Sequence, residues 1–238
     1  MAELLVVLPT YNERESLPGV IARIRAAVPE AHILVVDDNS PDGTGDLADA
    51  LADDHVAVLH RAAKQGLGRA YLAGFERAFS GRYTYVAEID ADGSHDPAEL
   101  PAMLALAVGG ADLVIGSRWI AGGSVRNWPW LRRAISRAGN GYSRVMLRSR
   151  IHDITAGFRV FRVSALQSAH LDGVSSQGYC FQVEMAWRLE SAGATVIEHP
   201  ITFVERQQGR SKMHLGIVTE ALLRVTGWGL AAGLRKRQ

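Results

Sequence analysis

Along the first half of the chain, short apolar runs alternate with longer segments in which apolar residues recur at helical spacing. Of all the features of the sequence, this alternation constrains the fold most. The runs that suit single strands are residues 4–8, 33–36, 56–59, 83–89 and 113–115. Apolar residues recur at helical spacing from Leu17 to Val28, with Ser16 placed as a candidate N-cap. Further helices are predicted over residues 43–52, 68–79 and 97–107, the last capped by Asp96. The pattern is typical of βαβ units that build a mainly parallel sheet.

The second half departs from this alternation. A loop containing glycine and tryptophan, residues 116–130, precedes a basic helical stretch over residues 131–150. Later elements are predicted as a strand over 157–163, a helix over 181–192, strands over 195–198 and 201–204, and a helix over 215–234. Because no repeat or linker interrupts the chain, we predict one domain, residues 1–212, followed by an amphipathic helix and basic tail, residues 213–238.

Composition excludes several classes of protein. The chain has 238 residues, of which 47% are hydrophobic, so it can bury a substantial core. Its net charge of +1 gives no general attraction for nucleic acid, and we expect no nucleic-acid partner. Cys180 is the single cysteine, which rules out an internal disulfide and favours a buried thiol. The N-terminal apolar run is too short for a signal peptide or a membrane span, which favours a cytoplasmic protein.

A cluster of acids follows the fourth predicted strand. The stretch "AEIDADGSHDP" places Glu88, Asp90, Asp92 and Asp96 within nine residues. Ligands bind at the carboxyl ends of the strands in an open α/β sheet. Carboxylates there can hold a hard divalent cation whose other ligands are water and phosphate oxygens. Taken alone, however, the acidic pair fits a solvated turn equally well.

Nine motifs in order resemble family 2 glycosyltransferases of the GT-A fold, and specifically the polyprenol-phosphate (dolichol-phosphate) mannosyltransferases. They are "LPTYNE", "VVDDNSPDGT", "KQGLGRAY", "EIDADGSHDP", "GSRW", "NWPWLRRAISR", "DITAGFRVFR", "GYCFQVEM" and "FVERQQGRSK". The resemblance spans nearly the whole chain. It implies an α/β GT-A-like fold, inverting transfer of mannose from GDP-mannose to polyprenyl phosphate, and a Mg²⁺ or Mn²⁺ cofactor.

The resemblance also implies roles for individual residues. The donor site would comprise Pro9, Tyr11, Glu13, Val36, Asp38, Lys64, Asp90, Ala91, Asp92, Arg118, Arg206 and Lys212. The metal ligands would be Asp90, Asp92 and Ser94, with water between Ser94 and the metal as an alternative. The acceptor phosphate would contact Arg118, Arg132 and Ser136, with Arg133 as the alternative to Arg132. The catalytic residues would be Asp92, Arg118 and Arg206.

The chemistry of such a transfer needs no protein base. A phosphate monoester is already anionic at neutral pH, so its oxygen can attack the sugar directly. Cations stabilise the charge that develops on the departing diphosphate. We therefore interpret His95, His152 and His199 as structural, and attack opposite the leaving group predicts inversion at the sugar carbon.

Other functions stay open at this point. The same fold could use UDP-glucose or another nucleotide sugar, and a non-catalytic nucleotide-sugar binding module is a further alternative. A hydrolytic or retaining enzyme would need a carboxylate pair across the sugar. A nucleotidyltransferase would need a glycine-rich basic loop after the first strand, which "LPTYNERESL" lacks. Residues 38–43 imitate a calcium loop, but we interpret them as a turn that caps a helix.

The C-terminal stretch suggests contact with a membrane surface. Its uncharged part is about half of the roughly 20 residues that span a bilayer. It fits either a helix packed on the domain or an interfacial helix with Trp228 and the basic residues 235–237 at the headgroups. Longer relatives carry C-terminal transmembrane segments. The resemblance therefore implies peripheral binding at the inner membrane face, or a separate membrane-anchoring protein.

Overall fold

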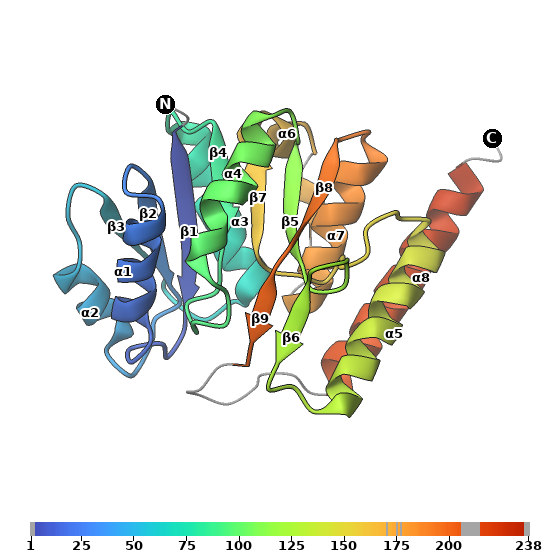
Figure 1. Ribbon diagram of the computed structural model, residues 1–238, viewed down its shortest axis with the longest axis horizontal. Helices are drawn as coiled ribbons and strands as arrows, with labels where there is room; N and C mark the ends of the chain where they lie inside the picture. Colours follow the sequence, from blue (N-terminus) through green and yellow to red (C-terminus); the bar gives the residue numbers. More distant parts are fainter. Residues whose placement is uncertain (1–2, 170, 175, 177, 206–214, 236–238) are drawn as a thin grey trace.

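A central seven-stranded sheet organises the computed structural model, which describes residues 3–169, 171–174, 176, 178–205 and 215–235. Its strand order is β3-β2-β1-β4-β7-β5-β8 (Figure 1). These strands are β1 (Leu4–Thr10), β2 (His32–Asp37), β3 (Val56–His60), β4 (Tyr85–Glu88), β5 (Leu113–Ser117), β7 (Arg159–Arg162) and β8 (Val196–Pro200). A second sheet pairs β6 (Ser124–Arg126) with β9 (Thr202–Val204).

The seven-stranded sheet is parallel except at one strand. The pairs formed by β1 with β2, β1 with β4, β2 with β3, and β5 with β8 are all parallel. Strand β7 runs antiparallel to both of its neighbours, β4 and β5. The prediction of a mainly parallel sheet is therefore confirmed, whereas the reversed direction of β7 was not predicted.

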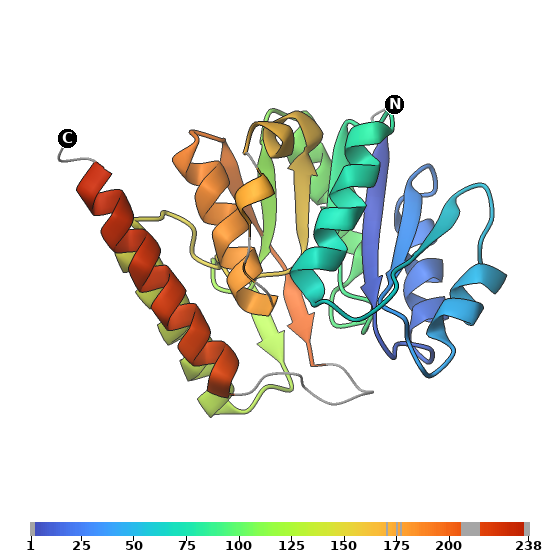
Figure 2. The same cartoon turned by 180° about the vertical axis from the view of Figure 1, so that it is seen from behind.

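Helices cover both faces of this sheet. They are α1 (Leu17–Ala27), α2 (Thr44–Ala50), α3 (Leu67–Ser80), α4 (Leu100–Val108), α5 (Trp130–Leu147), α6 (Val163–Ser168), α7 (Gly178–Ser191) and α8 (Leu215–Arg235), with short 3₁₀ helices at Pro97–Glu99 and Leu171–Gly173. Helices α1 and α4 lie on the face seen in Figure 1, and α3 and α7 lie on the face seen in Figure 2. Helices α5 and α8 run side by side beyond β8 in both views.

Two apolar cores result, one on each face of the sheet. Under α3 and α7, the large buried side chains include Tyr71, Phe75, Phe161 and Phe181. Under α1 and α4, they include Leu8, Leu17, Ile24 and Leu100. Each strand of the sheet alternates its side chains between the two cores, which explains why β1 and β2 are apolar along nearly their whole length.

Most predicted elements are confirmed, with shifts of a few residues at their ends. Asp96 caps the helix that follows it, because its carboxylate accepts a hydrogen bond from the main-chain N–H of Ala98 at 3.1 Å. Ser16 occupies the N-cap position of α1 as predicted, but its hydroxyl donates to the main-chain oxygen of Glu13 at 3.2 Å and does not cap the helix. Strand β6 and helix α6 were not predicted, since three and six residues carry too little periodicity.

The C-terminal helix packs on the domain, as one of the two alternatives predicted. Trp228 of α8 stacks on Trp187 of α7, with ring centroids 5.7 Å apart and planes inclined by 15°. The Tyr142 and Thr226 hydroxyls join α5 to α8 at 2.5 Å. Trp228 therefore belongs to a helix interface, which favours the alternative of a packed helix over that of Trp228 at lipid headgroups. Residues 236–238 lie outside the described residues.

Glycine allows α3 to lie directly against the sheet. A Cβ atom on Gly74 would stand 2.4 Å from Val7 Cγ1 in β1, closer than real carbon atoms approach. Gly139 in α5 has no heavy atom within 4 Å of the same position. Comparing alanine substitutions at these two glycines therefore distinguishes the steric cost of an added methyl group from its effect on helix propensity.

We expect Gly74→Ala to lower the free energy of unfolding by about 1–3 kcal/mol through overpacking. Gly139→Ala is the matched control. It should raise the free energy of unfolding by less than about 1 kcal/mol, because alanine has a higher helix propensity than glycine. Urea unfolding followed by circular dichroism measures both. Equal stability of the two variants would show that α3 can move away from β1 without cost.

Candidate active site

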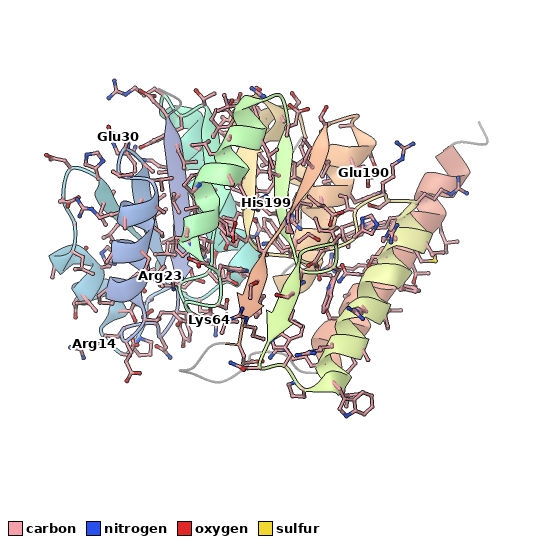
Figure 3. All side chains as sticks on the ribbon, in the orientation of Figure 1. Arg14, Arg23, Glu30, Lys64, Glu190 and His199 are labelled. Atoms are coloured by element: carbon pink, nitrogen blue, oxygen red, sulfur yellow. The ribbon has the colours of Figure 1, made fainter. Side chains whose placement is uncertain are left out.

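Chemically active side chains gather at one edge of the seven-stranded sheet. The carboxyl ends of β1, β2, β4 and β5 meet there because these strands run in the same direction. Figure 3 shows Lys64 at this edge, toward which the arrowheads of the strands point. The edge is where open α/β sheets bind ligands, and the predicted Tyr11, Asp38, Asp90 and Arg118 all follow strands that end there.

The loop after β2 is held rigidly by its own aspartates. The Asp37 carboxylate accepts hydrogen bonds from the Thr10 hydroxyl at 2.9 Å and from the Ser40 main-chain N–H at 3.0 Å. Asp38 forms an ion pair with Arg61 and accepts a hydrogen bond from the Gln65 main-chain N–H at 3.2 Å. The loops after β1, β2 and β3 are thereby fixed to one another.

This loop turns into α2 as predicted. Asp42 accepts a hydrogen bond from the main-chain N–H of Thr44 at 3.0 Å, and Gly43 has the positive φ of 82° that the turn requires. The interpretation of residues 38–43 as a capping turn is thus confirmed.

The half-buried Tyr11 and the exposed Lys64 lie at the rim of this part of the site. The Lys64 ammonium lies 3.8 Å from the centroid of the Tyr11 ring, a cation–π distance. Nearby, the main-chain N–H of Glu13 donates to the Thr44 hydroxyl at 3.0 Å. The structure therefore brings three of the predicted donor residues, Tyr11, Glu13 and Asp38, onto neighbouring loops.

The acidic motif after β4 presents two carboxylates at the same edge. The side chain of Asp90 is 34% exposed, and its Oδ1 accepts a hydrogen bond from the Tyr71 hydroxyl at 3.3 Å. Asp92 Oδ1 accepts a hydrogen bond from the Ser94 main-chain N–H at 3.0 Å. Within the described residues no three acidic, histidine or cysteine side chains are grouped as metal ligands. Two carboxylates nevertheless suit Mg²⁺ or Mn²⁺, which take their other ligands from water and phosphate.

Ser94 differs from these carboxylates in its accessibility. Only 2% of the residue is exposed, and its hydroxyl oxygen has no hydrogen-bond partner in the described part of the chain. Val36 and Ala91 are also enclosed, with side chains that pack into the two cores. The predicted contacts of these three residues with a ligand stay predictions.

A buried glutamate and a buried arginine lie next to each other beneath the acidic motif. Glu88 and Arg159 face each other across β4 and β7, and both are fully buried. Burial raises the pKa of Glu88 to about 8, although the nearby Arg159 guanidinium opposes the shift. Burial likewise lowers the pKa of Arg159 to about 10. Tyr71 lies beside this pair, and burial together with Asp90 raises the pKa of its hydroxyl, which therefore stays a donor.

His95 is buried among aromatic rings, and its Nδ1 lies 3.9 Å from Asp90 Oδ2. Its ring lies 5.3 Å from that of Phe158 and 5.2 Å from that of Phe203. Burial lowers the pKa of His95 to about 4, so the ring is neutral at physiological pH. His152 and His199 are paired with Glu198 and Glu99 at 2.8 and 2.9 Å.

Arg118, after β5, is held by a buried carboxylate. Its Nε and one terminal nitrogen each donate to Asp153 at 2.7 Å, and its main-chain N–H does so at 2.9 Å. The guanidinium also lies 5.5 Å from the Trp128 ring and 5.6 Å from the Phe203 ring. Removing Asp153 would leave the buried guanidinium of Arg118 without its carboxylate partner, at a cost of about 3–5 kcal/mol.

Arg132, near the start of α5, meets a different carboxylate. It forms an ion pair with Glu205 and stacks on Trp128 at 4.1 Å. Arg118 and Arg132 thus contact the same tryptophan. The predicted Ser136 lies one turn farther along α5, where its main-chain oxygen accepts a hydrogen bond from Asn140 at 2.9 Å. The arginines predicted to meet one phosphate are therefore neighbours in space.

The sequence analysis missed several residues that shape this site, and two predicted residues lie outside the structure. Tyr71, Asp153 and Glu205 stand within recognised motifs, but nothing in a single sequence indicates which cation or carboxylate each contacts. Arg206 and Lys212 lie outside the described residues.

Comparison with known proteins identifies the family. Residues 5–169 match the family described as Glycosyl transferase family 2, which is more than half of the chain. The chain belongs to this family. It is 53% identical over 233 residues to the polyprenol monophosphomannose synthase of Mycolicibacterium smegmatis, covering 97% of this chain and 88% of that protein. It is 54% identical over 239 residues to the undecaprenyl-phosphate mannosyltransferase of Micrococcus luteus, covering 98% of both.

Solved structures confirm the α/β fold of the GT-A type. A mannosyltransferase from Pyrobaculum calidifontis, in complex with GDP-Man and Mn²⁺, matches 98% of this chain and 64% of that chain with a TM-score of 0.63. Glucosyl-3-phosphoglycerate synthase from Mycobacterium tuberculosis, in complex with Mn²⁺ and UDP-glucose, matches 97% of this chain and 78% of that chain with a TM-score of 0.67. At 16% and 18% identity, these matches concern the fold alone.

A cavity of about 630 Å³ lies apart from this family 2 site. Its lining includes Met146, Trp187, Val196 and Gly229, and none of the predicted site residues. It separates α5 and α8 from β8 near the start of that strand, away from the carboxyl edge. The chemistry of the strand ends therefore locates the active site better than cavity volume does.

Glu88 gives the family 2 site a testable pH dependence. Its pKa is about 8 in the folded chain against an ordinary value of 4.5, so between these values the unfolded chain releases a proton that the folded chain keeps. Raising the pH through this window favours unfolding. We expect the unfolding free energy of the wild type, relative to Glu88→Gln, to fall between about pH 5 and pH 8, by at most about 1.4 kcal/mol per pH unit.

Urea unfolding at several pH values measures this difference, with Glu30→Gln, an exposed site, as control for the loss of one carboxylate. A difference between the wild type and Glu88→Gln that is constant across the window would contradict the raised pKa.

Proposed function

We propose that this family 2 glycosyltransferase moves mannose from GDP-mannose to a polyprenyl phosphate, giving polyprenyl-phosphate mannose. The similarity to two polyprenyl-phosphate mannosyltransferases along 97% and 98% of the chain carries this proposal. The geometry supports it, because an acidic pair and several arginines share the carboxyl edge of the sheet. One substrate brings a diphosphate and the other a phosphate, and both need cations.

Asp90 and Asp92 would hold Mg²⁺ or Mn²⁺ against the donor diphosphate. The metal supplies positive charge that stabilises the departing diphosphate. The two carboxylates fit this role because Asp90 is partly exposed and both follow the end of β4. Tyr11, Asp38 and Lys64 would hold the nucleoside and phosphates, since their loops are tied together beside β1 and β2.

The acceptor phosphate would bind where Arg118 and Arg132 flank Trp128. Guanidinium groups suit this task because they bind phosphate through paired hydrogen bonds. Glu205 holds Arg132 in the described structure, so an incoming phosphate would compete with this carboxylate. Arg118 keeps its orientation through Asp153 and would contribute its charge from a fixed position.

The acceptor oxygen would then attack the sugar carbon opposite the diphosphate and invert its configuration. The phosphate is anionic at neutral pH, so no general base is required. The neutral, buried state of His95 agrees with this chemistry, since a base would need to reach the attacking oxygen. Fixed positive charges around the leaving group supply the stabilisation of the transition state.

A panel of donors with polyprenyl phosphate tests the proposed reaction. We expect lipid-linked mannose from GDP-mannose in the presence of Mn²⁺, and no product after EDTA treatment. Asp92→Asn should lose metal-dependent turnover while keeping the far-ultraviolet circular dichroism of the wild type. Product from UDP-glucose and none from GDP-mannose would instead support the alternative donor.

Arg132 provides the test of the acceptor site. We expect Arg132→Ala to reduce kcat/KM for polyprenyl phosphate by at least about tenfold, or about 1.4 kcal/mol, because one phosphate contact is lost. Arg150→Ala, an exposed arginine beyond the far end of α5, is the matched control for the loss of charge. Calorimetry should show that GDP-mannose binding persists in both variants. Unchanged acceptor kinetics in Arg132→Ala would move the site to Arg133.

The acceptor is a lipid, so we also propose that the enzyme binds a membrane surface through α5 and α8. No described helix is long and apolar enough to cross a bilayer. Large apolar side chains are nevertheless exposed on these two helices: Trp130, Leu131, Ile135, Val145, Leu222, Leu223 and Leu230. Leu131 and Ile135 lie one helical turn apart on α5, and the same helix carries the basic residues Arg133 and Arg137, whose charges suit anionic headgroups.

We expect the double variant Leu131→Glu and Ile135→Glu to float poorly with liposomes containing anionic lipid, because it places charge on the proposed membrane face. Val108→Glu, at an exposed apolar residue on α4, is the control and should float like the wild type. Equal flotation of all three proteins would assign membrane contact to another surface.

A further inference from the structure

A tyrosine hydroxyl reaches the acidic motif from inside the protein. Tyr71 of α3 is fully buried, and its hydroxyl donates to Asp90 Oδ1 at 3.3 Å. Asp90 lies at the surface end of this contact, since its side chain is 34% exposed. The hydrogen bond therefore links the apolar core beneath α3 to a carboxylate at the proposed metal site.

The Tyr71 ring has little freedom to move. It stacks on Phe181 with centroids 6.0 Å apart and planes inclined by 8°, and on Phe75 at 6.4 Å and 22°. Helix α3 cannot shift easily either, because Gly74 lies against Val7 and Gly68 lies against Phe181. Side chains in a closely packed protein interior keep one conformation. The Tyr71 hydroxyl is thus a fixed donor to Asp90.

Asp90 needs such a donor because its surroundings are acidic. The carboxylate of Asp92 lies two residues after it. Repulsion between neighbouring carboxylates favours rotation of an exposed side chain away from the others. The hydrogen bond from Tyr71 to Oδ1 limits this rotation, while Oδ2 lies 3.9 Å from Nδ1 of the buried His95. Partners of metal-binding carboxylates commonly act in this way.

We propose that Tyr71 is a positioning residue, which orients the Asp90 carboxylate and so sets the affinity of the enzyme for its divalent cation. The inference rests on the proposed function, in which Asp90 is a metal ligand. It assigns to the "GRAY" segment of α3 a task in the reaction, although its side chain is buried and does not touch the substrates.

Binding of Mn²⁺ by Tyr71→Phe tests the proposal without a turnover assay. The substitution removes one hydroxyl and keeps the stacked ring. Electron paramagnetic resonance of free Mn²⁺, with GDP present, gives the dissociation constant. We expect it to rise about tenfold in Tyr71→Phe, the lower end of the usual range for such partners. In the transfer assay, the Mn²⁺ concentration for half-maximal rate should rise similarly, whereas kcat at saturating Mn²⁺ should change less than threefold.

Tyr85→Phe is the matched control. Tyr85 is also a buried tyrosine, and its hydroxyl bonds to the main-chain oxygen of Ala107 at 3.5 Å, on the other face of the sheet. This variant should bind Mn²⁺ like the wild type. In an Asp90→Asn background, Tyr71→Phe should cause no further loss, because the hydroxyl would have no metal-binding carboxylate to orient.

Three results would overturn the proposal. One is a dissociation constant for Tyr71→Phe within twofold of the wild-type value, and another is an equal rise in Tyr85→Phe, which would indicate a general loss of stability. A further tenfold loss on adding Tyr71→Phe to Asp90→Asn would show that the hydroxyl acts elsewhere. If the wild type itself bound no Mn²⁺, the metal dependence of the proposed function would fail first, and the role of Tyr71 with it.

Discussion

The reversed direction of β7 is the constraint on which the active site depends. Because β7 runs antiparallel between β4 and β5, its amino-terminal end lies at the carboxyl ends of its neighbours. The segment that leads into β7 therefore enters the site, and it brings Asp153 to the guanidinium of Arg118. A parallel strand in this place would leave its preceding segment at the opposite edge of the sheet. One reversed strand thus supplies the carboxylate that orients an arginine at the site.

The same strand supplies the counter-charge beneath the acidic motif. Register between β4 and β7 sets Arg159 opposite Glu88, and both are fully buried. Three acids at alternate positions, Glu88, Asp90 and Asp92, would repel one another strongly in an apolar setting. A buried cation opposes this repulsion, and the raised pKa of Glu88 allows that residue to stay protonated at neutral pH. The sheet can therefore present two carboxylates at its edge without a third charge below them.

Aromatic side chains join the loops that carry these charges. The Phe203 ring contacts both His95, beyond the acidic motif, and Arg118, after β5. Trp128 lies between Arg118 and Arg132, which come from different elements. Flat apolar surfaces of this kind exclude water and hold guanidinium groups by cation–π attraction. These aromatic rings thus join the acidic motif and the two arginines of the proposed acceptor site in one packed cluster.

The sequence by itself determined most of the strands and helices and the edge of the sheet where the acids gather, because hydrophobic periodicity and turn residues act locally. The ordered motifs also indicated the family, which the comparisons confirm. Only the tertiary structure decided the direction of β7, the place of Trp228 at a helix interface, and the partners of Arg118, Arg132 and Asp90. These side-chain pairs join residues that are 19 to 73 positions apart in the sequence. The pairs depend on strand direction and packing, which leave no local pattern in a single sequence.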